Sequence, residues 1–485
     1  MPSILSSYPE YEVNIGIEVH VQLVTNSKIF CACSNAVVKE PNTTICEICA
    51  GYPGTLPVLN KKVVDYAIMA GLATNCAIAP ISQFARKHYF YPDLPKGFQI
   101  TQHTMPICEE GYVTIYVSDN TIKKIRLIRI HMEEDAGKSM HASRTKESFV
   151  DLNRAGTSLL EIVSYPDISS AEEARAYLKE LRLIVQYLGI STGNMEEGAF
   201  RADTNISVKK KGSTTLGTRC ELKNINSFKF ISDAIEYEIE RQILLLEEGK
   251  KVIQETRLWD PQKKETFSMR SKEEAADYRY FPEPDLPLIE VATKWIEEMR
   301  AHLPELPRAR FTRYLSEYKL TPYEAGILIE DRVLARYFEE AYSHYAGNKL
   351  IHWVLRDILG YLNDEKITLS ECKITPEKLA GLIKSLDEGV INNTSAKKVF
   401  SLMAQIGKDS ATIIEEYNFA QVGSQGELET LVKEIVAAYP QQVEQYRAGK
   451  DKLFGFFVGQ VMKRTEGKAD PKVLNRLLKT FLDGK

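Results

Sequence analysis

The chain has 485 residues, of which 44% are hydrophobic, and its formal net charge is -4 at pH 7. A chain of this length exceeds one hydrophobic core, so we expect about two to four globular domains. The charge excludes an overall basic field, so contact with nucleic acid would require a local basic patch.

The sequence has no apolar run long enough to span a bilayer, and its first residues lack the basic and then apolar order of a signal peptide. We therefore expect a cytoplasmic protein without membrane contact. Eight cysteines are too few for a disulfide scaffold in a chain of this size. In a reducing compartment, a close group of cysteines is more typical of a metal site.

Four segments show the alternation of apolar and polar side chains that is typical of a strand with one buried face. They cover residues 13–23, 127–133, 201–208 and 219–223. Their other faces carry these acidic, basic and imidazole side chains: Glu18, His20, Arg129, His131, Glu133, Arg201, Asp203, Arg219, Glu221 and Lys223. These faces are candidates for a functional site.

Two helices are expected among these strands. Ser169 or Ser170 can cap the first, with a glutamate three residues later, and Gly189 ends it. The second is predicted over residues 232–248 and ends at Gly249. Because strands and helices follow in an irregular order, without a regular βαβ repeat, the pattern favours an α+β fold with a mainly antiparallel sheet.

Residues 278–287 are rich in proline, which predicts an extended stretch that closes the first domain near Glu290. Beyond it, Thr321, Thr375 and Asp470 each precede a proline, as expected at helix starts. The later part of the chain is therefore predicted to be nearly all α.

We divide the chain into three predicted domains. The first covers residues 1–290 and contains the charged strands. A helical domain over residues 291–372 and an α-helical tail domain over residues 373–485 follow it, with the division near Cys372.

The cysteines form two close pairs, Cys31 with Cys33 and Cys46 with Cys49, separated by a loop. This spacing suits a tetrahedral zinc site of four thiolates. Because four thiolates leave no open position for a substrate, we expect a structural role. Buried free thiols are the alternative.

Carboxylates and one imidazole on the polar strand faces could converge on Mg²⁺, with arginines and lysines holding phosphate oxygens. The candidate ligands are Glu18, His20, Glu133 or Glu134, and Glu221. For any one strand, a solvated face with incidental ion pairs is the alternative, and four such strands together favour a site. The sequence has no Walker-type glycine loop, so side chains and metal would have to hold phosphate.

Residues 131–138 place three carboxylates beside a histidine. Repulsion between these like charges lowers the stability of the fold unless a cation neutralises them. Strict alternation would place Glu133 on the face of His131, whereas a bulge would turn Glu134 inward instead. Both alternatives stay open.

Two basic stretches could contact nucleic acid. Residues 86–95 are basic and aromatic, so they could stack on a base or pack as an ordinary loop. The tail carries a run of basic residues that could bind phosphate, although such runs are usually solvated faces. They are Lys463, Arg464, Lys468, Lys472, Arg476 and Lys479.

Taken in order, these motifs closely resemble the B subunits of glutamyl/aspartyl-tRNA amidotransferases. The similar stretches are residues 15–23, 86–95, 131–138, 151–156, 160–163, 201–207, 221–224, 277–287, 396–400 and 455–460. The resemblance runs through nearly the whole chain.

The resemblance implies a fold and an activity. It implies an N-terminal cradle domain related to glutamine synthetase and guanidino kinases, followed by helical and tail domains that hold tRNA. Such a protein uses ATP and Mg²⁺ to phosphorylate the side-chain carboxylate of glutamate or aspartate mischarged on tRNA(Gln) or tRNA(Asn). The glutaminase, or A subunit, of the complex releases ammonia, which arrives through a channel, and a small C subunit braces the assembly.

The resemblance also implies roles for residues. The implied magnesium ligands are Glu18, His20, Glu134 and Glu221, with Glu133 as the near substitute. The implied phosphate contacts are Arg201, Arg219 and Lys223. The implied gate of the ammonia channel is formed by Lys87 and Asp203.

Two other functions are weighed against this one. A non-enzymatic, zinc-containing tRNA-binding scaffold would use the charged sheet without ATP, and ATP turnover would separate it from an enzyme. A small-molecule carboxylate amine ligase on the same fold would not need a long helical arm. No arrangement typical of a glutaminase nucleophile stands out, so the ammonia would come from a partner or from free ammonium.

Overall fold

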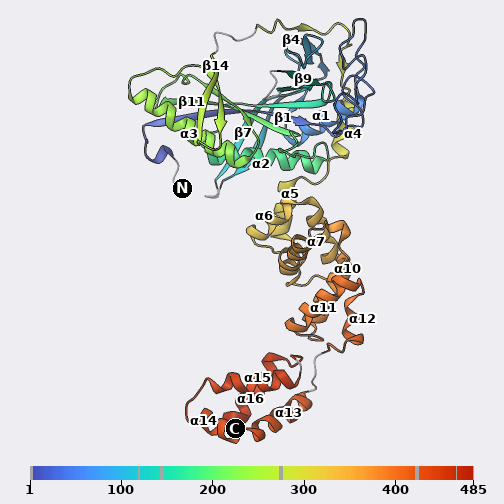
Figure 1. Ribbon diagram of the computed structural model, residues 1–485, viewed down its shortest axis with the longest axis vertical. Coiled ribbons are helices and arrows are strands. Elements are labelled where there is room, and N and C mark those ends of the chain that lie inside the picture. Colours follow the sequence, from blue (N-terminus) through green and yellow to red (C-terminus); the bar gives the residue numbers. More distant parts are fainter. Residues whose placement is uncertain are drawn as a thin grey trace. The chain divides into compact units, whose positions relative to one another are not determined.

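The computed structural model describes residues 4–117, 121–141, 147–271, 277–420, 425–465 and 467–483. The chain forms two compact units, Met1–Ala309 and Arg310–Lys485. Strands and helices are mixed in the first unit, whereas the described elements of the second are all helical (Figure 1). Within the described ranges, no helix is both long and apolar enough to cross a membrane.

Nine described strands form the main sheet of the first unit. In sheet order they are β14 (Glu265–Ser271), β13 (Glu255–Asp260), β12 (Cys220–Ile225), β11 (Phe200–Lys210), β1 (Tyr11–Gln22), β10 (Ser158–Ser164), β7 (Ile122–Glu134), β6 (Cys108–Tyr116) and β2 (Ala77–Ile78). Strands β12 and β13 run parallel, and the other neighbouring pairs are antiparallel. The prediction of a mixed fold with a mainly antiparallel sheet is confirmed.

One face of the sheet is apolar and is covered by α1 (Lys61–Ala73), α2 (Ala171–Leu188) and α3 (Phe228–Glu247), as Figure 1 shows. Burial along β1 alternates strictly, so that every second side chain packs toward these helices and the others face the opposite side. The apolar core therefore lies on one side of the sheet and the charged side chains of β1 lie on the other.

The helix ends follow local signals. Ser170 caps α2 by accepting a hydrogen bond from the backbone of Glu173, and Gly189 ends the helix with a positive φ of 69°. The helix predicted over residues 232–248 begins earlier, at Phe228, because Ser227 accepts a hydrogen bond from the backbone of Phe230. That predicted start was therefore wrong by one turn.

Small elements accompany the main sheet. Strand β4 (Ala85–His88) lies between β15 (Phe281–Pro282) and β5 (Phe98–Thr101), and β5 packs against β7. The remaining pieces are η1 (Ile4–Ser6), the pair β3 (Ile81–Ser82) and β16 (Ile289–Glu290), the pair β8 (Lys138–His141) and β9 (Ser148–Asp151), and α4 (Thr293–Ala301). The extended stretch predicted over residues 278–287 thus contributes an edge strand.

The helices that follow begin with α5 (Pro307–Ser316), which crosses from the first unit into the second. The others are α6 (Pro322–Glu330), α7 (Arg332–His344), α8 (Leu350–His352), the π-helical turn η3 (Trp353–Ile358), α9 (Leu359–Glu365), η4 (Leu369–Glu371), α10 (Pro376–Asp387), α11 (Asn393–Ile406), α12 (Ser410–Glu416), α13 (Gln425–Ala438), α14 (Pro440–Arg447), α15 (Leu453–Arg464) and α16 (Pro471–Asp483). The predicted caps Thr321, Thr375 and Asp470 each accept a hydrogen bond from the first turn of α6, α10 and α16.

The second unit contains two hydrophobic clusters. One gathers buried side chains from Tyr314 to Ile414, and the other gathers them from Leu428 to Leu482. Cys372, where the helical region was divided, packs against the first cluster. The division into helical and tail domains stays a prediction.

Candidate functional site

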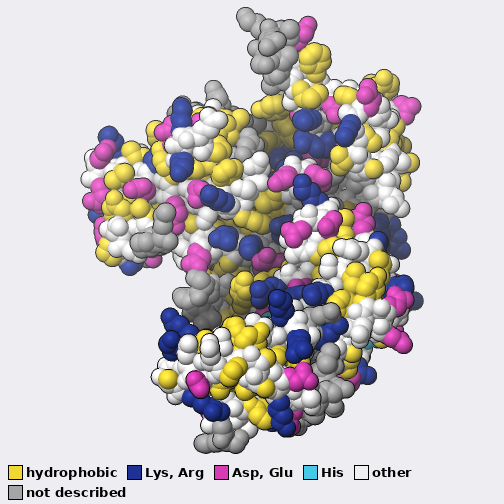
Figure 2. Space-filling model, turned by 60° about the horizontal axis from the view of Figure 1, so that its bottom comes forward, with side chains coloured by type: hydrophobic (Ala, Val, Ile, Leu, Met, Phe, Trp, Pro, Cys, Tyr) yellow, Lys and Arg dark blue, Asp and Glu magenta, His cyan; other side chains and the backbone are white. Residues whose placement is uncertain are grey.

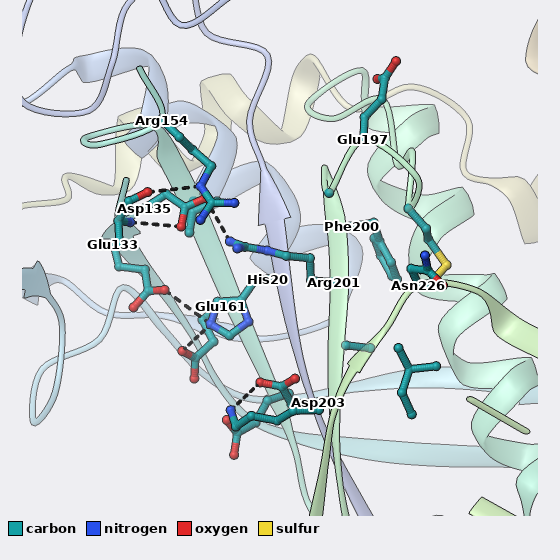
Figure 3. Close-up of a pocket in the computed structure, with 18 of the residues that line it drawn as sticks. His20, Glu133, Asp135, Arg154, Glu161, Glu197, Phe200, Arg201, Asp203 and Asn226 are labelled. Atoms are coloured by element: carbon teal, nitrogen blue, oxygen red, sulfur yellow. Dashed lines mark hydrogen bonds and ion pairs between the residues drawn. The ribbon is translucent and has the colours of Figure 1, made fainter. Parts of the chain in front are cut away.

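The polar face of the central strands borders a cavity of about 610 Å³. Its lining comes from β1, β4, β5, β10, β11 and β12, from the end of β7, and from loops between them (Figure 3). The cavity therefore lies over the middle of the sheet, on the side opposite α1, α2 and α3.

Two histidines and two carboxylates form a buried cluster beside this cavity. Cross-strand pairing places His20 on β1 opposite Glu161 on β10, and Glu161 opposite His131 on β7. The Nε2 atom of His20 lies 3.1 Å from a Glu161 oxygen and 3.4 Å from a Glu133 oxygen. His131 Nε2 lies 3.6 Å from Glu161 and 3.7 Å from Glu133.

The charges in this cluster stabilise one another. Burial opposes the charge of His20, but the carboxylates of Glu133 and Glu161 outweigh it and raise the pKa of His20 to about 10. Burial likewise opposes ionisation of Glu161, yet the neighbouring imidazoles lower its pKa to about 2. The pKa of Glu133 is held well below its ordinary value for the same reason.

This donor set fits a hard divalent cation. His20, Glu133 and Glu161 each offer one ligand atom, and the three atoms lie within 4.8 Å of one another. Two anionic oxygens, together with the His20 ring nitrogen once it has lost its proton, can bind Mg²⁺ that also keeps water or phosphate ligands. The cluster could therefore hold a metal at the wall of the cavity.

A second polar group lies across β1, β11 and β12. Lys223 Nζ lies 2.7 Å from an Asp203 oxygen and 3.0 Å from a Glu221 oxygen, and Glu221 also accepts a 2.9 Å hydrogen bond from Thr256. Glu18 stands opposite Asp203 in the β1–β11 pairing. Burial, followed by the negative charges of Glu161 and Glu221, raises the pKa of Glu18.

The structure places Glu133 and Glu134 on opposite sides of β7. Glu133 joins the histidine cluster, in agreement with strict alternation from His131. Glu134, predicted as a magnesium ligand, instead pairs with Lys96 and accepts a 2.9 Å hydrogen bond from the backbone of Ile100. Because β7 pairs regularly with β10 through Glu134, no bulge turns this side chain toward the cluster.

Of the basic side chains predicted for the site, some line the cavity and one does not. Lys87 and Arg201 line the cavity, and Lys223 does so beside Asp203. Burial opposes the charge of Lys87, but nearby Glu133 outweighs it and raises the pKa of Lys87. Arg219 directly precedes β12, is exposed and does not line the cavity.

Sequence reasoning missed several residues of this site, and three of them contact other charged side chains there. Glu161 is one, although it is the only ionisable residue of the apolar strand β10, which was an available signal. The others are Asp135 and Arg154, which line the cavity with Arg201. Their roles depend on contacts between loops and strands that no local pattern shows.

The four clustered cysteines meet as their spacing predicts. Their sulfur atoms all lie within 4.8 Å of one another, and Cys31 Sγ is 3.3 Å from Cys49 Sγ. Hydrogen bonding from Cys31, together with the nearby ammonium of Lys28, lowers the pKa of Cys49 to about 4. Four sulfurs so placed, one of them stabilised as thiolate, fit a tetrahedral zinc site of Cys31, Cys33, Cys46 and Cys49.

Comparison with known proteins gives strong similarities over the whole chain. A family model described as the GatB/GatE catalytic domain matches residues 13–297, and one described as the GatB domain matches residues 336–482. The first of these ranges contains the cavity lining and the four clustered cysteines.

Several similar proteins are named as B subunits of aspartyl/glutamyl-tRNA(Asn/Gln) amidotransferases. The chain is 55% identical over 475 residues to the one from Syntrophotalea carbinolica, a match that covers 98% of this chain and 99% of that one. It is 56% identical over 471 residues to that of Trichlorobacter lovleyi, covering 97% and 99%. With that of Persephonella marina it shares 50% over 475 residues, covering 98% and 100%.

Proposed function

Because the chain belongs to the GatB/GatE family, we propose that it is the component of a tRNA-dependent amidotransferase that converts mischarged Glu-tRNA(Gln), Asp-tRNA(Asn) or both. The observation that carries the proposal is the cluster of His20, Glu133 and Glu161 beside a cavity lined by lysine and arginine. Metal ligands next to cationic side chains are what the transfer of a phosphoryl group requires.

The chemistry has two steps. A carboxylate is a poor acyl donor, so the side-chain oxygen of the mischarged amino acid first attacks the γ-phosphorus of ATP. The new O–P bond forms as the bond to the β–γ bridging oxygen breaks, and ADP leaves with the electron pair. Ammonia then attacks the acyl carbon, the C–N bond forms, the C–O bond breaks, and phosphate leaves while the nitrogen loses a proton.

Each part of the cavity has a proposed role. His20, Glu133 and Glu161 hold Mg²⁺, which when bound offsets the charge of the phosphates. Glu18 in the cavity lining adds negative charge that attracts the cation, and Glu221 does so from just outside it, through its pair with Lys223. Arg201 and Lys223 contact phosphate oxygens. Glu134 and Arg219 are not part of this set, because the first pairs with Lys96 and the second lies outside the cavity.

Ammonia is proposed to arrive from a partner glutaminase, the A subunit of such a complex, with a small C subunit bracing the assembly. Lys87 and Asp203 form the proposed gate of the ammonia path, supported by their positions in the cavity lining. We also propose that residues 1–290 form a cradle domain related to glutamine synthetase and guanidino kinases.

The helical domain of residues 291–372 and the tail of residues 373–485 are proposed to hold tRNA. Figure 2 shows several Lys and Arg side chains among hydrophobic and acidic ones on the part of the surface that comes forward. The exposed basic residues of α15 and α16 are Lys463, Arg464, Lys472, Arg476 and Lys479. They can contact the phosphate backbone of RNA without reading its sequence.

The cysteine cluster is proposed to bind one structural zinc. Elemental analysis of protein purified without a chelator should find about one zinc per chain. A variant in which Cys31, Cys33, Cys46 and Cys49 are all replaced by serine is the control and should contain no zinc. Protein that contains no zinc would contradict this proposal.

Amidation by the assembled complex tests the function. Purified complex is given Glu-tRNA(Gln), ATP, Mg²⁺ and ammonium chloride, so that neither the glutaminase nor the channel is needed. We expect Gln-tRNA, ADP and phosphate in equal amounts, and the same with Asp-tRNA(Asn) if that is also a substrate. Gln-tRNA formed without ATP consumption would contradict the phosphorylation step.

A further inference from the structure

Two arginines meet at one buried carboxylate beside the histidine cluster (Figure 3). Arg201 donates from Nη2 to an Asp135 oxygen at 3.0 Å, and Arg154 Nε lies 3.3 Å from the same oxygen. All three residues line the cavity. The two guanidinium groups and one carboxylate leave a net positive charge at this wall.

Arg154 is held in place from several sides. Its guanidinium donates to the backbone oxygens of Ala136, at 3.1 Å, and Gly137, at 2.7 Å. A side chain at Gly137 would place its Cβ 2.9 Å from the Asp151 carbonyl oxygen, so only glycine allows the chain to pass this closely. The position of the Arg154 guanidinium is thus set by the backbone around it.

The turn that carries Arg154 is also anchored to the cysteine loop. The preceding residue, Asn153, accepts hydrogen bonds from the backbone of Thr43 and Thr44 at 2.8 and 2.9 Å and donates to the Glu40 carbonyl oxygen at 2.7 Å. The buried ammonium of Lys28 lies 3.5 Å from Cys49 Sγ and 3.5 Å from the Leu152 carbonyl oxygen. The cysteine loop therefore helps to position the arginine.

The two guanidinium groups keep donors for a ligand. The side chain of Asp135 is only 9% exposed, whereas those of Arg154 and Arg201 are 41% and 34% exposed. In the described part of the chain, the buried Nε of Arg201 has no hydrogen-bond partner. Each guanidinium carries five N–H donors in a planar fork, which matches an anion with several oxygens.

The pair lies directly beside the proposed metal ligands. Arg201 on β11 stands opposite His20 on β1, and Asp135 follows Glu133 by two residues. An anion between the two groups would contact metal on one side and arginine on the other. Phosphoryl oxygens meet this requirement, since they bind metal and guanidinium at the same time.

We propose that Arg154 and Arg201, joined by Asp135, form a paired-arginine site for the phosphoryl group that moves from ATP to the substrate carboxylate and leaves as phosphate. Arg201 was already a candidate, and Arg154 with Asp135 is the new assignment. The inference rests on the proposed function. Arg154 binds the group directly, and Asp135 acts as a positioning residue that keeps the two cations together.

The test uses the complete complex with ATP, Mg²⁺, Glu-tRNA and ammonium, and inorganic phosphate as the probe. For Arg154→Ala we expect kcat to fall about 100-fold, as for loss of one donor to a developing charge. We expect the inhibition constant of inorganic phosphate to rise about tenfold, with tRNA affinity unchanged. Arg154→Lys keeps the charge without the fork and should lose about tenfold in kcat.

Arg126→Ala is the matched control. Arg126 lies on β7 and pairs with Asp167 at 2.7 Å, but it does not line the cavity. Its removal should leave kcat and phosphate inhibition within about twofold of the wild type. If Arg154→Ala does not fold, Arg154→Lys provides the same comparison.

The outcomes separate this inference from the function on which it rests. If the wild-type complex forms Gln-tRNA without consuming ATP, the proposed function fails. If the wild type consumes ATP and folded Arg154 variants keep wild-type phosphate inhibition, the arginine site alone is wrong, whatever happens to kcat. Weaker phosphate inhibition in both variants, with the control unchanged, supports the site.

Discussion

The two compact units of the chain bury different kinds of side chain. The first unit buries the following acidic, basic and histidine residues: Lys28, His131, Glu133, Glu134, Asp135, Glu161, Glu180, Glu238, Arg257 and Glu283. Among the described residues of the second unit, the buried polar side chains are Asn392, Ser395, Ser410 and Thr465, none of them charged. Burying a charge costs folding free energy unless the charge is paired. This cost arises in the first unit and not in the described residues of the second.

Buried charge by itself does not mark the functional site. Glu238 is fully buried on α3, where Arg241 donates to it at 2.7 Å and Thr266 at 3.1 Å, and it ties the helix to the edge of the sheet. It does not line the cavity, whereas Glu133 and Glu161 do. The comparison therefore teaches that buried charge must coincide with a cavity before it indicates chemistry.

The largest expected effect tests the charged side of this comparison. Glu161→Gln keeps the size of the side chain and removes one anionic ligand, so ATP-dependent amidation with supplied ammonium should fall about 1,000-fold. The measurement is the rate of Gln-tRNA formation at several Mg²⁺ concentrations.

Glu180→Gln is the matched control for this change. Glu180 is an equally buried glutamate, but it lies on α2 and does not line the cavity. Its replacement should leave the rate within about twofold of the wild type. Equal losses in both variants would mean that burial, rather than the cavity, determines the effect.

The apolar side of the comparison is tested in the tail. Leu478 on α16 is completely buried in the last hydrophobic cluster, so Leu478→Ala should cost about 3 kcal/mol of tail stability. Amidation at saturating tRNA should not change, because Leu478 is not one of the residues proposed to hold metal or phosphate. Denaturant unfolding checks the first claim, with the exposed neighbour Lys479→Ala as control. A lower amidation rate at saturating tRNA would show that the second unit takes part in catalysis.

A smaller effect is expected at Glu221, which does not line the cavity but pairs with Lys223 at its wall. Glu221→Gln removes a partner of Lys223 but leaves the cluster of His20, Glu133 and Glu161 intact. We expect amidation to fall about tenfold, with a higher Mg²⁺ requirement. A loss as large as that of Glu161→Gln would place Glu221 among the direct metal ligands. The same rate assay measures both variants.

The smallest effect concerns an exposed ion pair of the same sheet. The Arg126 guanidinium holds the pKa of Asp167 below its ordinary value of 3.8. A carboxyl with a lowered folded-state pKa stabilises the fold above its unfolded pKa, and this contribution is lost as the pH falls through the folded value.

Because Arg126 is 62% exposed, Asp167→Asn should cost only about 0.5 kcal/mol at pH 7. As the pH falls below the ordinary pKa of Asp167, the difference in the free energy of unfolding between Asp167→Asn and the wild type should narrow. Urea unfolding of the variant and the wild type at pH 7 and at the lower pH measures the difference in the free energy of unfolding. A cost at pH 7 as large as that expected for Leu478→Ala would contradict the view that exposed pairs contribute little.

Several features of the fold were predictable because their signals are local. The alternation of β1 and β11 follows from the two-residue period of a strand, and the caps Ser170 and Thr321 act within one turn. The cysteine cluster was also predictable, since its pairs are only two and three residues apart.

Other parts of the site could not be predicted from such patterns. Glu161 joins the cluster because β10 lies between β1 and β7, an order that does not follow the sequence. Arg219 was predicted to lie on the polar strand face together with Glu221, but the strand begins only after it, at Cys220. The choice between Glu133 and Glu134 depended on whether β7 stays regular to its end.

The sequence by itself determined the strand faces, the helix caps and the residue types available for metal and phosphate, because each depends on neighbours a few positions away. Only the tertiary structure decided which of these residues meet. His20 and Glu161 are far apart in the chain, and Arg154 reaches Asp135 through a turn anchored to the cysteine loop. Their proximity depends on strand register and loop packing, which act across the whole sheet.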